Sequence, residues 1–188
     1  MRRIVLIVLL AVLPAGFVAK TAQTEETSLE EVTLGLKVGM IGFTSTAADE
    51  LNVDSGPYVG LEAFRKISER LHLGGEIGYA RSSGSIPLVE TELTYVPIEL
   101  NLKYAAAVTQ RMDFTLGGGF SYNYVRFEAD CLGTCFDSEE DWHPGLQLFG
   151  GVQFNALRFL LGVEGKYQVS EERDLDNWRL TAQAGYRF

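Results

Sequence analysis

The two cysteines are the side chains with the clearest chemistry in this sequence. Cys131 and Cys135 are its only cysteines and lie four positions apart in a polar stretch. In an exported chain they favour a disulfide, and because the ring that it closes is very small, it would shape a loop tip. A metal site that adds His143 is the alternative, but two cysteines and one histidine do not complete a tetrahedral ligand set. We therefore predict a disulfide, and neither a metal nor another cofactor.

Catalysis would need side chains that the sequence does not bring together. His72 and Glu76 share one face of a predicted strand, but at four residues apart they lie about 13 Å from one another and do not touch. A lipid hydrolase would need a serine paired with a histidine, and the sequence places no serine at short spacing from an inward histidine. The run from Asp137 to Asp141 resembles a calcium loop only in its charge, because it lacks the glycine and the ligand spacing, and the acidic residues here favour a solvated, mutually repelling surface. We expect no catalytic residues.

The beginning of the chain predicts export. Arg2 and Arg3 precede an uncharged run from Ile4 to Ala19, the pattern of a secretory signal peptide, which we place at residues 1–22. Residues 23–32 are predicted to be a flexible acidic segment, and residues 33–188 a single domain. The formal net charge is −9. The only charged residues of the signal peptide are basic, so its removal makes the chain more acidic. Such an acidic chain is not expected to bind nucleic acid, because phosphate contacts need Lys and Arg.

The rest of the sequence alternates between apolar and polar residues with a period of two, which predicts β-strands with two different faces. Pro97 predicts a bulge or another local irregularity, because proline cannot donate to a strand ladder. No later run approaches the roughly 20 apolar residues of a membrane helix. The predicted strands are eight in number and cover residues 33–43, 57–64, 71–80, 92–104, 113–127, 145–155, 159–169 and 177–188.

The connections between these strands alternate in length. Those after the first, third and fifth strands have about ten residues or more, whereas those after the second, fourth and sixth are tight. Outer-membrane barrels have an even number of strands, short periplasmic turns and long extracellular loops. The pattern predicts an all-β fold, an eight-stranded antiparallel up-and-down transmembrane β-barrel.

The polar face separates this barrel from a soluble one. A lipocalin-like barrel has the same alternation with its apolar face turned inward. Here the polar face carries little freely solvated charge, and its acids and bases nearly balance. Buried charges need partners, and the walls of an eight-stranded barrel lie within reach of one another. We predict a charge network in the lumen, formed by Lys37, Glu62, Glu76, Glu99, Lys103, Glu164, Lys166, Arg179 and Arg187.

Aromatic residues of the apolar face gather near the strand ends, as in the two interfacial girdles of a membrane barrel. The residues on the side of the long loops are Tyr79, Tyr122, Tyr124, Tyr167 and Trp178. Those on the side of the turns are Tyr104, Phe114, Phe154, Phe159 and Phe188.

With these girdles, a signal peptide and a strand that ends on Phe188, the chain resembles small eight-stranded bacterial outer-membrane proteins of the OmpA/OmpX type. The resemblance covers about residues 33–188. It implies a monomer in the lipid of the bacterial outer membrane, exported through its signal peptide. It also implies that Tyr186 and Phe188 form a C-terminal insertion signal for the barrel-assembly machinery, and that the long loops face the outside.

The function implied by this resemblance is a non-enzymatic structural or surface-interaction role, with an extracellular ligand bound through the loops. A narrow channel or transporter of small solutes is one alternative. An outer-membrane lipid-modifying enzyme is the other.

Overall fold

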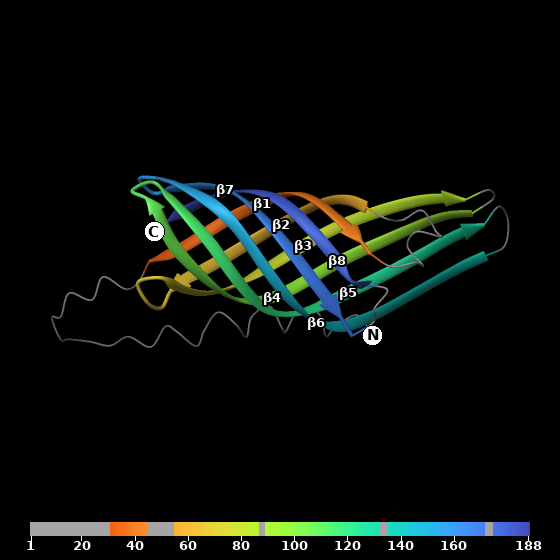
Figure 1. Ribbon diagram of the computed structural model, residues 1–188. Coiled ribbons are helices and arrows are strands. Elements are labelled where there is room, and N and C mark those ends of the chain that lie inside the picture. Colours follow the sequence, from red (N-terminus) through yellow and green to blue (C-terminus); the bar gives the residue numbers. More distant parts are fainter. Residues whose placement is uncertain (1–30, 45–54, 87–88, 132–134, 172–174) are drawn as a thin grey trace.

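The computed structural model describes residues 31–44, 55–86, 89–131, 135–171 and 175–188. Each strand pairs antiparallel with its neighbours in the sequence, and β8 pairs with β1, so that the sheet closes (Figure 1). The strands are β1 (Val32–Phe43), β2 (Ser55–Lys66), β3 (Leu71–Ile86), β4 (Val89–Thr109), β5 (Met112–Cys131), β6 (Cys135–Ala156), β7 (Phe159–Ser170) and β8 (Asn177–Arg187). This confirms the predicted eight-stranded up-and-down barrel. In the described residues, no helix has the length and apolar character to span a membrane.

The two faces of the wall are opposite in character to those of a soluble barrel. Large apolar side chains point outward, and Leu148, Phe120 and Leu61 are 72%, 68% and 60% exposed. Charged and amide side chains point inward and are buried, Lys37 and Asn101 among them at 1% exposed. Only a hydrocarbon surrounding stabilises such an outer surface. The arrangement excludes the soluble barrel, whose apolar face would point into the lumen.

The aromatic girdles lie on the outer face as predicted, with one addition. Trp142, which the sequence analysis placed in a loop, belongs to β6 and stacks on Tyr122 with 4.9 Å between the ring centroids. It also contacts Tyr124, at 5.3 Å. At the opposite end, Tyr186 packs edge-on against Phe159 and Phe188 at 5.4 and 4.9 Å.

Two of the predicted long loops are mainly strand. β3 continues to Ile86 and β4 begins at Val89, and residues 128–144, predicted as the longest loop, are largely the ends of β5 and β6. The strands in these segments could not be recognised from their polar composition, because a ladder outside the membrane needs no apolar face on either side. Residues 45–54 and 172–174 of the other two predicted loops lie outside the described residues.

The backbone around Pro97 has the predicted local irregularity on one side and no bulge. The pairing with β3 is interrupted between Ile98 and Tyr95, with the same register on both sides, whereas Pro97 pairs with Asn123 of β5 in an unshifted register. The interruption agrees with a proline, which has no N–H to donate to a ladder. A register shift in β4 falls between Ala107 and Thr109, where the strand meets its periplasmic turn.

Candidate functional site: the closed lumen and the extracellular sheet

Three glutamates stand side by side on one inner wall of the barrel. Glu62, Glu76 and Glu99 are successive register partners across β2, β3 and β4, and all three are buried. Like charges placed directly opposite each other destabilise a sheet. The three carboxylates therefore require cations nearby.

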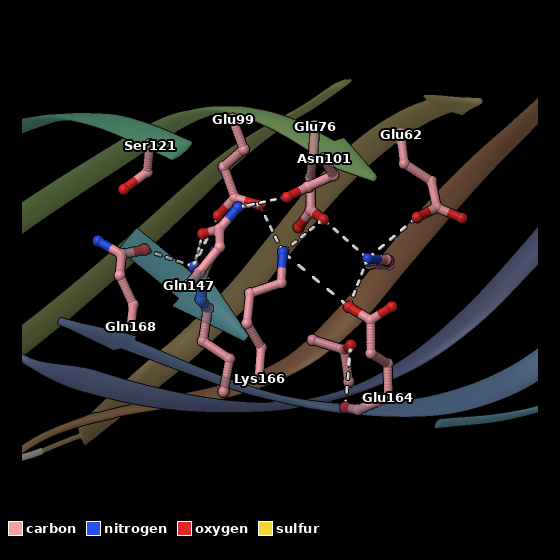
Figure 2. A network of polar contacts seen from close by, with 12 residues as sticks. Glu62, Glu76, Glu99, Asn101, Ser121, Gln147, Glu164, Lys166 and Gln168 are labelled. Carbon is pink, nitrogen blue, oxygen red and sulfur yellow. Dashed lines mark hydrogen bonds and ion pairs between the residues drawn. The ribbon is translucent and has the colours of Figure 1, made fainter. Parts of the chain in front are cut away.

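Two lysines on other strands supply most of this charge: Lys37 on β1, which adjoins β2, and Lys166 on β7, across the lumen from β3. Figure 2 shows Lys166 pointing toward Glu76 and Glu99. The Nζ of Lys37 on β1 lies 3.0 Å from a carboxylate oxygen of Glu62, and 2.7 Å from oxygens of Glu76 and Glu164. The Nζ of Lys166 on β7 lies 2.8 Å from Glu76 and 2.5 Å from Glu99. Each lysine thus joins carboxylates that come from different strands.

Arg179 and Lys103 complete the network. Arg179 of β8 lies 2.6 Å from Glu99 and donates a hydrogen bond of 2.7 Å to Gln168. Lys103 lies 3.4 Å from Glu62, and its ammonium sits 3.9 Å from the ring centroid of Phe64. The network contains four carboxylates and four cations, and its formal charge is zero.

Arg187 is the one predicted member that the structure places elsewhere. It pairs with Glu31 and donates to Asn155 at 3.1 Å, at the periplasmic end of the barrel. Arg187 shares the inward parity of Arg179 but follows it by eight residues, so it lies beyond the reach of the central carboxylates. The alternation along β8 predicted correctly that both arginines point inward. Their different positions along the barrel axis give them different partners.

Polar neighbours hold the carboxylates in place. Gln147 donates to Glu99 at 2.8 Å and to Asn101 at 2.6 Å, and Tyr58 donates to Glu76 at 2.6 Å. Tyr58 reaches Glu76 by lying against Gly78, where a Cβ atom would stand 2.2 Å from the tyrosine oxygen. The inward glycine at this point is therefore needed for space.

The extracellular end of the lumen is closed by a second layer that the sequence analysis missed. The fully buried Tyr95 donates to Asn123 at 2.9 Å and accepts hydrogen bonds from Gln168 and Asn177 at 2.7 and 3.3 Å. An apolar cluster surrounds this hub and consists of Ile41, Phe43, Tyr58, Ala80, Leu93, Val125 and Leu175. Strand parity is the signal that could have revealed those that lie in strands, which are all of them except Leu175, but apolar residues at inward positions were not expected.

The other predicted residues lie outside this layered lumen. His72 lines a small recess at the periplasmic end together with Lys103, Asp113 and Gln153. Among the described residues, no three His, Cys, Asp or Glu side chains are placed to hold a metal ion. Cys131 and Cys135 are the outermost register partners of β5 and β6. Their side chains lie outside the described part of the structure, so the disulfide stays a prediction.

Strands β3 to β6 continue beyond the closed barrel as a four-stranded extracellular sheet, formed by residues 81–86, 89–95, 125–131 and 135–144 (Figure 1). The last β2–β3 pair is Tyr58 with Ala80, whereas β3 and β4 remain paired as far as Ile86 and Val89. β7 pairs with β6 only from Gly145 inward. The sheet therefore extends beyond the ladders of β1, β2, β7 and β8. At its base it still contacts them, since Ser82 donates to the carbonyl oxygen of Ser55 on β2 and Tyr95 accepts hydrogen bonds from Gln168 and Asn177.

Phe188 lies at the periplasmic end of β8, where its N–H donates to the carbonyl oxygen of Val32 at 2.9 Å and its ring is exposed. The insertion signal formed by Tyr186 and Phe188 remains a prediction. We expect Phe188→Asp to lower the amount of protein at the cell surface, because the change removes the terminal aromatic side chain and puts a charge on the lipid face. Surface labelling against Phe188→Tyr as a control measures this, and equal levels of both variants would contradict it.

Comparison with known proteins identifies the family. The outer membrane protein beta-barrel domain matches residues 8–188, whereas no match is found among curated proteins. Ail, the attachment invasion locus protein of Yersinia pestis, is 14% identical, with a TM-score of 0.59 over 85% of this chain and 99% of Ail. Neisserial surface protein A is 16% identical, with a TM-score of 0.62 over 84% and 97% of the two chains. OprG from Pseudomonas aeruginosa is 13% identical, with a TM-score of 0.59 over 85% and 96%.

At these identities the solved structures support the fold alone, and they agree with the closed eight-stranded barrel of this chain. The family match covers most of the sequence and includes all eight strands. The chain therefore belongs to the outer membrane protein β-barrel domain family and is a protein of the bacterial outer membrane.

Proposed function

We propose that this protein is a non-enzymatic surface-interaction protein, and that its extracellular sheet contacts a partner outside the cell. The observation that carries the proposal is the extension of this sheet beyond the closed barrel. From Cys135 to Trp142, β6 pairs within the described residues with β5 alone, so that one edge of the sheet is available. An available edge accepts an additional strand from a partner, in which main-chain hydrogen bonds supply the affinity.

The charge of the sheet favours a cationic partner. Its segments carry acidic residues in excess, and the two described arginines are already paired, Arg81 with Glu92 and Arg126 with Glu128 and Glu140. Complementary charge steers association and suppresses partners of the same sign. One solved structure of Ail contains the heparin analogue sucrose octasulfate. A polyanion of that kind is disfavoured here by like-charge repulsion.

The filled lumen counts against the channel alternative. The charge network occupies the centre, and Tyr95 and its apolar cluster lie above it. The interior of an eight-stranded barrel is just wide enough for side chains to fill.

A shortened variant tests the role of the sheet. Because Ser82 faces Leu93 and Phe127 faces Glu139, Asn-Gly turns can replace residues 83–92 and 128–138 without changing the register of the remaining strands. In nanodiscs of zwitterionic lipid, we expect the full chain to bind an immobilised polylysine surface and not a heparin surface, and the shortened variant to bind neither. Biolayer interferometry with empty nanodiscs as a reference measures this. Equal binding of both chains to polylysine, or binding of the full chain to heparin, would overturn the proposal.

A further inference from the structure

An arginine recurs at one position of the periplasmic rim. Three of the four strands that run from the periplasmic to the extracellular end are immediately preceded by an arginine: Arg70 before β3, Arg111 before β5 and Arg158 before β7. The carbonyl oxygen of each arginine accepts a backbone N–H from the strand that follows in the barrel. The donors are Ala105 at 2.8 Å, Asn155 at 2.7 Å and Arg187 at 2.8 Å. The three arginines are thus held at equivalent places by equivalent bonds.

An aromatic residue accompanies each arginine. The residues directly before the three N–H donors are Tyr104, Phe154 and Tyr186, all on the outer face of the barrel. Arg70 donates to the hydroxyl of Tyr104 at 3.1 Å, and Arg158 donates to that of Tyr186 at 3.4 Å. Phe154 has no hydroxyl to accept such a bond. The guanidinium groups of Arg70 and Arg158 therefore lie against the lipid-facing wall, at the level of the aromatic girdle on the side of the turns.

The remaining strand of this direction, β1, carries an acid at the same position. The carbonyl oxygen of Glu31 accepts the N–H of Lys66 at 3.0 Å, and its carboxylate pairs with Lys66 and Arg187. Those two rim cations are thereby neutralised from within the chain.

The three repeated arginines are not neutralised in this way. Among the described residues, Arg70, Arg111 and Arg158 form no ion pair, whereas the exposed Arg81 and Arg126 at the extracellular end both pair with glutamate. A guanidinium has five N–H donors, and a tyrosine hydroxyl takes one of them. Most donors of each group remain available for an anion from outside the chain.

Each of these turns also exposes an apolar side chain beside its arginine. Ile67, Val108 and Leu157 are 50%, 58% and 98% exposed. Val108 lies at the register shift of β4, and Leu157 has a φ of 57°, so both depart from regular strand geometry. A cation next to an exposed apolar group at the membrane boundary matches an amphipathic ligand better than a freely soluble anion.

We propose that the three units, Arg70 with Tyr104, Arg111 with Phe154 and Arg158 with Tyr186, each bind the phosphate group of an anionic phospholipid in the periplasmic leaflet. The fork of guanidinium N–H groups matches phosphate oxygens, and the aromatic side chain lies at the boundary between head groups and acyl chains. The Ile67, Val108 and Leu157 side chains contact the acyl region next to each head group. This surface is at the opposite end from the extracellular sheet and does not depend on its proposed function.

Native mass spectrometry of the full chain in detergent, with phosphatidylglycerol or phosphatidylcholine added, tests this proposal. We expect up to three molecules of phosphatidylglycerol to be retained, one for each unit, and little phosphatidylcholine. Each Arg→Gln substitution should weaken phosphatidylglycerol binding about fivefold. Glycerol 3-phosphate, which lacks acyl chains, should not compete at the same concentration.

The matched control is the pair Arg81→Gln and Arg126→Gln, which removes two exposed arginines from the extracellular end and should leave lipid retention unchanged. Heat-modifiable gel mobility shows whether the triple variant of Arg70, Arg111 and Arg158 has folded. If the triple variant does not fold, the single variants decide, since each should retain less phosphatidylglycerol than the wild type at lipid concentrations below saturation. Equal retention of the two lipids, unchanged retention in the folded variants, or an equal loss in the control would overturn the proposal.

Discussion

Replacing Glu99 by alanine is expected to lower the free energy of unfolding by about 3–5 kcal/mol, because the change leaves buried cations without their partner. Glu99 lies 2.5 Å from Lys166 and 2.6 Å from Arg179, and it also accepts a hydrogen bond from Gln147. Urea unfolding of the refolded protein in lipid vesicles measures the difference. Glu92→Ala on the same strand is the matched control, since Glu92 pairs with the exposed Arg81 and an exposed pair contributes about 0–1 kcal/mol.

The same variant should not open a stable channel. Tyr95 and the apolar cluster above the network remain in place when Glu99 is removed, and they close the extracellular end of the lumen. Planar-bilayer recordings of the wild type and of Glu99→Ala test this. Steady conductance of the size of a porin from the wild-type protein would contradict the filled lumen and support the transporter alternative.

The second large effect concerns the lipid face. We expect Leu100→Arg and Val163→Arg each to destabilise the barrel by about 2–4 kcal/mol, the cost of a charge near the bilayer midplane. Both side chains point outward and are exposed along the membrane-spanning part of the wall. Refolding yield and urea unfolding in lipid vesicles measure the loss.

Gln153→Arg is the matched change on the inward face. Gln153 lines the periplasmic recess with Asp113, so an arginine there stays away from lipid and close to an acid. Its effect should be smaller than that of either outward arginine. The opposite ranking would mean that the outward residues do not contact lipid.

The period-two pattern predicted more of the candidate site than its short motifs did. Alternation assigned Lys37, Glu76, Glu99, Lys166 and Arg179 to the inner face, and the balance of their signs indicated pairing. The same argument included Arg187, which lies with Glu31 at the rim. Lys103, which shares a strand face with Glu99, pairs with Glu62 on β2 instead. Parity fixes the face of a residue, whereas its height and its partner across the lumen depend on strand tilt and stagger.

The boundary between strand and loop was predictable only inside the membrane. There, one face of every strand must be apolar, and the pattern is visible. The extracellular sheet has no such requirement, because water satisfies both of its faces, so residues 128–144 were predicted as a loop. Trp142 and the extra length of β5 and β6 followed from the ladder, which only the three-dimensional pairing of β5 with β6 defines.

By itself, the sequence determined that the chain is a barrel of eight strands with an apolar outside and a charged inside, because a membrane forces both faces into the residue pattern. The tertiary structure decided which charges meet, since Lys37 and Glu164 are 127 residues apart in the chain and are brought together only when the barrel closes. It also decided the hydrogen bonds around Tyr95 and the equivalent positions of Arg70, Arg111 and Arg158 at the periplasmic end. These depend on residues from several strands reaching the same height, which is a property of register and not of any single strand.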